Sequence, residues 1–191
     1  YKLKQNEIRF LDCGTSGGIE GAICGACMMI GGDKETFEKT EQLFKDLSAK
    51  DGYAYLGKSG AGHFSKAVHN AIEYGYMAAL AEGTRVISKS SFDIDLRKLL
   101  NLYNHGSIIQ SKLIDFLVSG MKKEYFESVS GSVPKGETEE EMRELAKICN
   151  MLILRQAIQM REDSRINPSD EGRFMSTMRH EFGRHPTNKG T

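Results

Sequence analysis

Four side chains that can hold or move protons are spaced along one segment, and a helix would bring them to the same side. The segment reads Lys66-Ala67-Val68-His69-Asn70-Ala71-Ile72-Glu73. Each helical residue turns by about 100°, so Lys66, Asn70 and Glu73 fall within roughly 60° of one another, with His69 one step to the side. The opposite side carries apolar or small residues, namely Phe64, Val68, Ala71, Ile72, Gly75 and Ala79.

This combination of an amine, an imidazole, an amide and a carboxyl suits proton transfer. A lysine partly removed from water has its pKa lowered toward neutrality, and a carboxyl in the same pocket has its pKa raised. The plainer interpretation is the solvated face of an amphipathic helix. Met77, Ala78 and Leu80 extend the apolar character around the helix and favour its burial on most sides. Buried Lys and Glu side chains are costly unless they are paired or used, which favours a functional face.

The elements that would position this helix change character along the chain. Residues 8–13, 27–30 and 53–56 read as strands, and Asp33 offers a cap for a helix that runs to Leu47. From Gly62 onward the pattern predicts helices at 62–88, 93–103, 107–121, 138–162 and 168–182, with Thr138 and Glu141 spaced as a capping box. The predicted fold is mainly α: residues 1–58 as the last strands of a Rossmann-type α/β domain, and residues 59–191 as an all-helical domain.

Composition excludes several classes of protein. Lys+Arg and Asp+Glu both number 26, so the net charge of +0 argues against a nucleic-acid or membrane-surface protein. The sequence has no apolar run long enough for a membrane span. Cys24 and Cys27 form a lone Cys-x-x-Cys pair, which is too few ligands for zinc. We expect no metal, and reduced, partly buried thiols in a cytoplasmic protein.

A glycine-rich turn, Gly57-x-x-Gly60-x-Gly62, precedes the helix with Lys66. Its spacing differs from the Gly-x-Gly-x-x-Gly turn of dinucleotide-binding folds, and no full βαβ unit surrounds it. Glycines there would let the helix N-terminus approach either a ligand or a neighbouring backbone closely.

Several motifs together resemble the signature of decarboxylating 6-phosphogluconate dehydrogenases of the short form. The central block is Lys66-Ala67-Val68-His69-Asn70-Ala71-Ile72-Glu73-Tyr74-Gly75, between Gly60-Ala61-Gly62-His63-Phe64 and Ala81-Glu82-Gly83. Upstream are Asp12-Cys13-Gly14-Thr15-Ser16-Gly17-Gly18 and Gly31-Gly32, and downstream Arg179-His180-Glu181-Phe182-Gly183-Arg184-His185. The resemblance covers nearly the whole chain. It implies a fold like the all-helical C-terminal domain of that family, in a chain that lacks most of the nucleotide-binding domain.

The resemblance also implies an activity, which is oxidative decarboxylation of 6-phosphogluconate to ribulose 5-phosphate with NAD or NADP. Lys66 would take the proton of the C3 hydroxyl, and Glu73 would protonate C1 after carbon dioxide leaves. The remaining implied roles are in substrate binding, by Ser16, Gly17, Gly18, His69, Asn70, Tyr74, Arg179 and His185. Arg179 and His185 would complete the site, often from a partner subunit.

Two departures from the family pattern lie in one region. A Trp-Arg-Arg-Gly-Ser element reads here Tyr103-Asn104-His105-Gly106-Ser107, and a following Arg is Gln110. Glutamine cannot grip a phosphate as arginine does. A related dehydrogenase of another β-hydroxy acid therefore stays an alternative, as does a non-catalytic oligomerising or ligand-binding module.

The resemblance and the helix pattern also carry expectations about partners. NAD and NADP cannot be told apart, because the cofactor site lies largely outside this chain, which by itself is expected to be inactive. We expect a homodimer or higher homo-oligomer, because a long helix with two apolar sides needs more cover than this chain offers.

Overall fold

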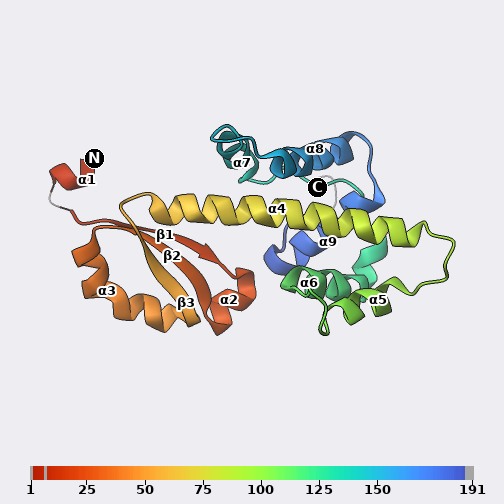
Figure 1. The fold of residues 1–191 in the computed structure, drawn as a ribbon, viewed down its shortest axis with the longest axis horizontal. Coiled ribbons are helices and arrows are strands. Elements are labelled where there is room, and N and C mark those ends of the chain that lie inside the picture. The colour runs from red at the N-terminus through yellow and green to blue at the C-terminus, as the bar shows by residue number, and fades with distance from the viewer. Residues whose placement is uncertain (1, 7, 188–191) are drawn as a thin grey trace. The chain divides into compact units, whose positions relative to one another are not determined.

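The computed structural model describes residues 2–6 and 8–187, and the chain divides into two compact units, residues 1–70 and 71–191. The division falls inside α4 (Ala61–Ser88), which is one unbroken helix (Figure 1). The predicted helix at 62–88 is therefore confirmed. The predicted domain boundary between residues 58 and 59 stays a prediction.

The first unit is a small sheet with helices. Its elements before α4 are α1 (Lys2–Gln5), β1 (Leu11–Ser16), α2 (Gly18–Cys24), β2 (Ala26–Gly32), α3 (Lys34–Leu47) and β3 (Ser48–Gly57). The strand order is β1-β2-β3, with β1 antiparallel and β3 parallel to β2. The strands predicted at 27–30 and 53–56 are present and longer at both ends, whereas the strand predicted at 8–13 begins and ends three residues later and α2 was not predicted.

The α3 helix forms where its sequence caps it and packs where its aromatic residues face the sheet. Asp33 accepts a hydrogen bond from the backbone N–H of Thr36 at 2.9 Å, as the sequence predicted. Phe37 and Phe44 stack with ring centroids 5.8 Å apart and are buried with Ile30. This small core attaches α3 to the strands that lead into α4.

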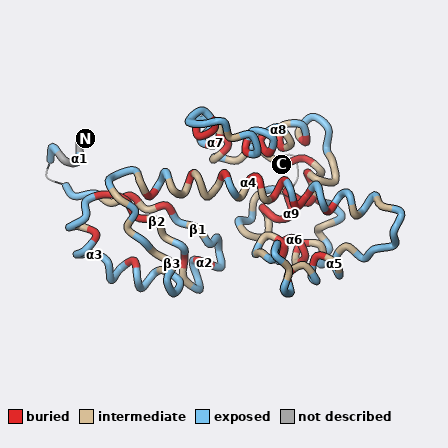
Figure 2. The backbone as a smooth tube through the Cα atoms, viewed as in Figure 1, coloured by how far each residue is buried: buried red, intermediate tan, exposed pale blue. Residues whose placement is uncertain are grey.

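The second unit is helical throughout, as the sequence predicted. Its elements after α4 are α5 (Leu96–Tyr103), α6 (Lys112–Met121), the 3₁₀ helix η1 (Glu124–Ser128), α7 (Glu139–Leu145), α8 (Leu152–Ile166) and α9 (Asp170–Gly183). Its core is contributed by α4, α5, α6 and α9 and includes Met77, Ala81, Leu100, Ile114, Leu117, Phe174, Met175 and Met178. Figure 2 shows the buried positions in red along the second half of α4 and on α6 and α9.

The expected helix at 138–162 is wrong, because the segment breaks into α7 and α8. After α7 the backbone tightens, and Lys147 and Ile148 donate to carbonyls three residues back. The predicted capping box is also wrong. Thr138 makes no side-chain cap bond, because its hydroxyl pairs with the hydroxyl of Tyr74 at 3.1 Å.

The expectation that α4 is buried on most sides is wrong, because one side of the helix carries exposed apolar residues. Phe64 is 52% exposed, Ile72 is 67% exposed and Val86 is 66% exposed. No helix among the described residues is both long and apolar enough to cross a membrane.

Candidate functional site

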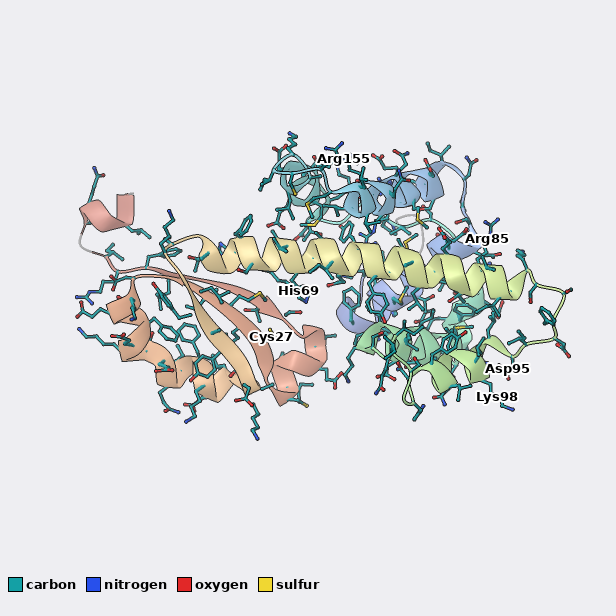
Figure 3. The ribbon with its side chains drawn as sticks, viewed as in Figure 1. Cys27, His69, Arg85, Asp95, Lys98 and Arg155 are labelled. Carbon is teal, nitrogen blue, oxygen red and sulfur yellow. The ribbon has the colours of Figure 1, made fainter. Side chains whose placement is uncertain are left out.

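Four side chains predicted for the site lie within hydrogen-bond distance of one another in the first unit, with His69 at the centre. Ser16, at the end of β1, places its Oγ 3.1 Å from Nε2 of His69 on α4. The Nδ1 of His69 lies 3.2 Å from Nζ of Lys66 and 3.3 Å from Oδ1 of Asn70. Figure 3 labels His69 on α4. The structure thus brings together Ser16, Lys66, His69 and Asn70, which we call the proton cluster.

The ring protons of His69 can be arranged in two ways. When Lys66 is charged, its ammonium donates to an unprotonated Nδ1, and Nε2–H donates to Ser16. When Lys66 is neutral, Nδ1–H can donate to its amine or to Oδ1 of Asn70, which accepts only from a protonated ring nitrogen. The geometry is therefore compatible with both states that a proton-transferring lysine passes through.

Glycines allow β1 to lie against the start of α4. A Cβ on Gly14 would collide with the Cβ of Lys66 and the backbone oxygen of Gly62. A Cβ on Gly62 would collide with the backbone oxygen of Met29 and would lie 2.9 Å from that of Asp12. Of the two predicted uses of the glycine-rich turn, the structure shows the close approach to a neighbouring backbone.

The loop after Ser16 also requires glycine. Gly17 and Gly18 have φ angles of 133° and 57°, a backbone region that other residues rarely adopt. A Cβ on Gly17 would lie 2.8 Å from the Cα of Gly21 in α2. Both glycines are exposed, so their backbone groups at the end of β1 are accessible to a ligand.

A second group of predicted residues gathers inside the second unit. Tyr74 is buried, and the guanidinium carbon of Arg161 lies 3.3 Å from the centroid of its ring. Arg179 is buried and donates from Nη1 to the backbone oxygen of Pro134 at 2.9 Å. We call Tyr74, Arg161, Arg179 and His185 the cation cluster.

The pKa shifts in the cation cluster show that its charged side chains interact with one another. Burial lowers the pKa of Arg161 to about 10, and the charge of Arg179 adds to that shift, whereas Tyr74 and the charges of Glu73 and Glu139 oppose it. Burial also lowers the pKa of His185, followed by the positive charges of Arg179 and Arg161. Like charges in a buried place destabilise each other's charged form unless an anion joins them.

Arg161 was missed by the sequence reasoning, although a signal was present. It is 2% exposed, and no group among the described residues accepts a hydrogen bond from its Nε. Along α8, the buried positions are Leu154, Ala157, Ile158, Arg161 and Ser164. An arginine thus occupies the apolar stripe of this helix, which is a place that arginine seldom takes without a use.

The other predicted site residue on α4 belongs to the second unit. Glu73 is partly exposed and follows Lys66 by seven residues, which is about two helical turns. Its role stays a prediction.

The two departures from the family pattern lie just after α5. Asn104 donates to Asp115 and to the backbone oxygen of Ser111, while Gln110 accepts from the N–H of Gly106. The departures therefore belong to a loop whose polar groups bond to one another. A shallow surface depression lies there, lined by Asn104, His105, Gln110, Ser111, Lys112 and Asp115.

The thiols correct one expectation. Cys24, Cys27 and Cys149 are exposed rather than partly buried, and Cys13 alone is partly buried. Among the described residues, no group of His, Cys, Asp and Glu side chains is arranged to hold a metal ion.

Known proteins resemble this chain in sequence and in structure. The sequence model of the NAD binding domain of 6-phosphogluconate dehydrogenase matches residues 1–57. The Bacillus subtilis protein YqeC, provisionally named a 6-phosphogluconate dehydrogenase, is 39% identical over 98% of this chain and 64% of its own length. An NAD(+)-dependent, decarboxylating 6-phosphogluconate dehydrogenase of Haloferax volcanii is 31% identical over 92% of this chain and 60% of its own length.

A solved structure agrees with the sequence matches. The 6-phosphogluconate dehydrogenase of Plasmodium falciparum superimposes with a TM-score of 0.75 at 26% identity, over 86% of this chain and 38% of that protein. This chain spans about three fifths of the length of the two sequence relatives. Residues 1–57 thus match the NAD binding domain of 6-phosphogluconate dehydrogenase, and nearly the whole chain is similar to proteins named 6-phosphogluconate dehydrogenase.

Proposed function

We propose that the full-length protein containing this chain is an NAD- or NADP-dependent, decarboxylating 6-phosphogluconate dehydrogenase. The observation that carries the proposal is the proton cluster, in which Lys66 and Ser16 both lie within hydrogen-bond distance of one imidazole, that of His69. A lysine held in this way can take a proton from a substrate hydroxyl and return it. The family match supports the same activity.

In this proposal the residues of the chain handle the protons of the reaction. Lys66 accepts the proton of the C3 hydroxyl, and its ammonium then polarises the C3 carbonyl while carbon dioxide leaves. Glu73 delivers a proton to C1. Ser16, Gly17, Gly18, His69 and Asn70 hold the sugar acid.

NAD or NADP, when bound, accepts the hydride from C3. The carboxylate of Asp12 already accepts hydrogen bonds from the backbone N–H groups of Gly60 and His63 at the start of α4. That helix end therefore does not fit a cofactor diphosphate, and we assign no cofactor contact to it.

The cation cluster supports the substrate class. Arg161, Arg179 and His185 are gathered with Tyr74 and Thr138 in the second unit. A phosphate offers the negative charge and acceptor oxygens that such a group lacks. We propose that these residues hold the phosphate of the substrate, which favours 6-phosphogluconate over an unphosphorylated β-hydroxy acid.

We also propose a homo-oligomer. The exposed apolar side chains of Phe64, Ile72 and Val86 recur along one side of α4, and a second copy of this chain would cover them.

The test is turnover by the full-length protein. With 6-phosphogluconate and NAD or NADP, reduced cofactor should accumulate, and Lys66→Met should lower kcat by about 10²- to 10⁴-fold with a much smaller change in KM. Lys45→Met on α3 is the matched control, because Lys45 is exposed and lies outside both clusters.

Undiminished turnover in Lys66→Met would contradict the role of Lys66. Oxidation of an unphosphorylated β-hydroxy acid, with none of 6-phosphogluconate, would contradict the substrate.

A further inference from the structure

A buried carboxylate outside the proton cluster ties β1 to α4. Asp12 is 3% exposed and lies on β1, four residues before Ser16. Its Oδ1 accepts from the N–H of Gly60 at 2.6 Å, and its Oδ2 accepts from the N–H of His63 at 2.9 Å. Gly60 immediately precedes α4 and His63 lies in its first turn, where backbone donors have no partner inside the helix.

This contact acts as a helix cap supplied by another element. An ordinary cap precedes the helix in sequence and satisfies its first N–H groups locally. Asp12 precedes α4 by nearly fifty residues, so its bonds fix where the helix lies on the strand. Burial alone would raise the pKa of Asp12, but the N–H groups of Gly60 and His63 outweigh burial and lower it.

Close packing makes this attachment rigid. A Cβ on Gly31 would lie 2.8 Å from Oδ1 of Asp12 and 2.8 Å from the backbone nitrogen of Gly62. The carboxylate, β2 and the start of α4 therefore fill one space. Because each oxygen bonds a different N–H of the turn, both the position and the rotation of the helix are set.

We propose that Asp12 is a positioning residue for Lys66, which rests on the role proposed above for Lys66 as the base. His63 and Lys66 are three residues apart on α4, so fixing the first turn fixes the direction in which Lys66 extends. The same strand carries Ser16, so Asp12 sets the distance between the two ends of the Ser16–His69–Lys66 chain. The negative carboxylate also occupies the positive end of the helix dipole.

The substitution Asp12→Asn tests the positioning role in the full-length protein. Asparagine has nearly the same shape, but its amide nitrogen would face one of the two N–H donors. A displacement of about 1 Å at a reacting group can lower the rate by about 10²-fold. We expect kcat to fall by 10- to 100-fold, with KM for 6-phosphogluconate changing much less.

The matched control is Asp33→Asn. Asp33 caps α3 in the same unit through the N–H of Thr36, and α3 carries no residue of either cluster. Asparagine caps a helix about as well as aspartate, so Asp33→Asn removes a charge at a helix start without removing the cap. We therefore expect it to change the melting temperature little and to leave kcat within about twofold, a change of less than 0.5 kcal/mol in barrier.

A second readout separates this proposal from the proposed function. The nitrogen chemical shifts of the His69 ring report its bonds to Ser16 and Lys66 and need no turnover. We expect them to change in Asp12→Asn and to stay unchanged in Asp33→Asn. If the wild type does not oxidise 6-phosphogluconate, the proposed function fails, and the ring shifts still decide whether Asp12 positions the cluster.

A folded Asp12→Asn protein with wild-type kcat and wild-type His69 ring shifts would overturn the proposal. If Asp12→Asn does not fold, Asp12→Ser is the substitute variant, because the serine hydroxyl keeps one acceptor near the helix end. For that variant we expect a reduced kcat and shifted His69 signals, and the same unchanged values would overturn the proposal.

Discussion

The proton cluster and the cation cluster differ in how far their polar side chains are buried and in how fully they are hydrogen-bonded. In the first, Ser16, His69 and Lys66 lie partly exposed and within hydrogen-bond distance of one another. In the second, Arg161 and Arg179 are buried, and Nε of Arg161 has no acceptor among the described residues. The side chains of the first group bond to one another, whereas the buried guanidinium groups of the second are compensated through the charges of Glu73 and Glu139 and not by a hydrogen bond to Nε of Arg161.

Because of this difference, the cation cluster is recognised from the burial of its charges, whereas the proton cluster is recognised from the chemistry of its residue types. A buried cation without a full set of partners lowers stability, and a protein keeps one where a bound group compensates. A self-bonded cluster carries no such cost and is recognised by its chemistry alone. Substitutions in the two clusters should therefore have different signatures, a lower kcat for the proton cluster and a higher KM, with little loss of stability, for the cation cluster.

Among the substitutions that distinguish the two clusters, Arg161→Met in the full-length protein is expected to have the largest effect, a rise in KM. Removing one partner of a buried charge pair costs about 2–5 kcal/mol of binding, so KM for 6-phosphogluconate should rise by roughly a hundredfold to a thousandfold. The ligand-free protein should lose little or no stability, because the substitution also removes a buried cation. Steady-state kinetics and thermal unfolding without ligand measure the two effects.

Arg155→Met is the matched control on the same helix. Arg155 is exposed and donates to the backbone oxygen of Ala146 (Figure 3). Its loss should leave KM nearly unchanged. An equal rise of KM in both variants would mean that Arg161 does not contact the phosphate.

The next effect is on stability and comes from Glu139, whose charge acts on Arg161 and Arg179 of the cation cluster. Glu139 is 1% exposed and bonds Arg165 at 2.9 and 3.0 Å, while Arg165 also donates to the backbone oxygen of Val133. Glu139→Gln leaves Arg165 and Arg143 without their buried counter-charge, which should cost about 3 kcal/mol of stability. Chemical denaturation at pH 7 measures the loss.

The sign of the pH dependence provides a further check on Glu139. Burial raises its pKa, but hydrogen bonds and charge from Arg165 and then Arg143 outweigh burial and hold the pKa below its usual value. The stability from this group is therefore present above the unfolded pKa and lost as pH falls through the folded pKa. Glu139→Gln should flatten the acid side of the stability curve. An unchanged acid side would show that other carboxylates determine it.

Periodicity predicted part of this fold and site well. Helical spacing alone placed Lys66, His69 and Asn70 together, because α4 is long and regular. Spacing could not place Ser16, which reaches His69 through packing between β1 and α4 and was predicted only from the resemblance. Thr138 failed as a cap because Tyr74, far away in sequence, bonds its hydroxyl. Arg161 was missed because a single charged position in an apolar stripe is weak until its burial is known.

The smallest expected effect concerns His185. Burial, then the charges of Arg179 and Arg161, lower its pKa below the ordinary value of 6.5. A bound anion would favour the protonated imidazole and raise that pKa, so binding should take up protons between the two values.

Sulfate is a suitable probe for this experiment, because it does not titrate in this pH range. We expect its affinity for the full-length protein to strengthen as pH falls from the pKa of His185 with anion bound to its pKa without anion, by at most tenfold per pH unit for one linked proton. Calorimetry in two buffers of different ionisation enthalpy measures the uptake. His185→Gln should abolish the uptake, and His105→Gln, at an exposed histidine of the same unit, should leave it unchanged. Proton uptake that persists in His185→Gln would place the titrating group elsewhere and leave the cation cluster with its arginines as the anion-binding groups.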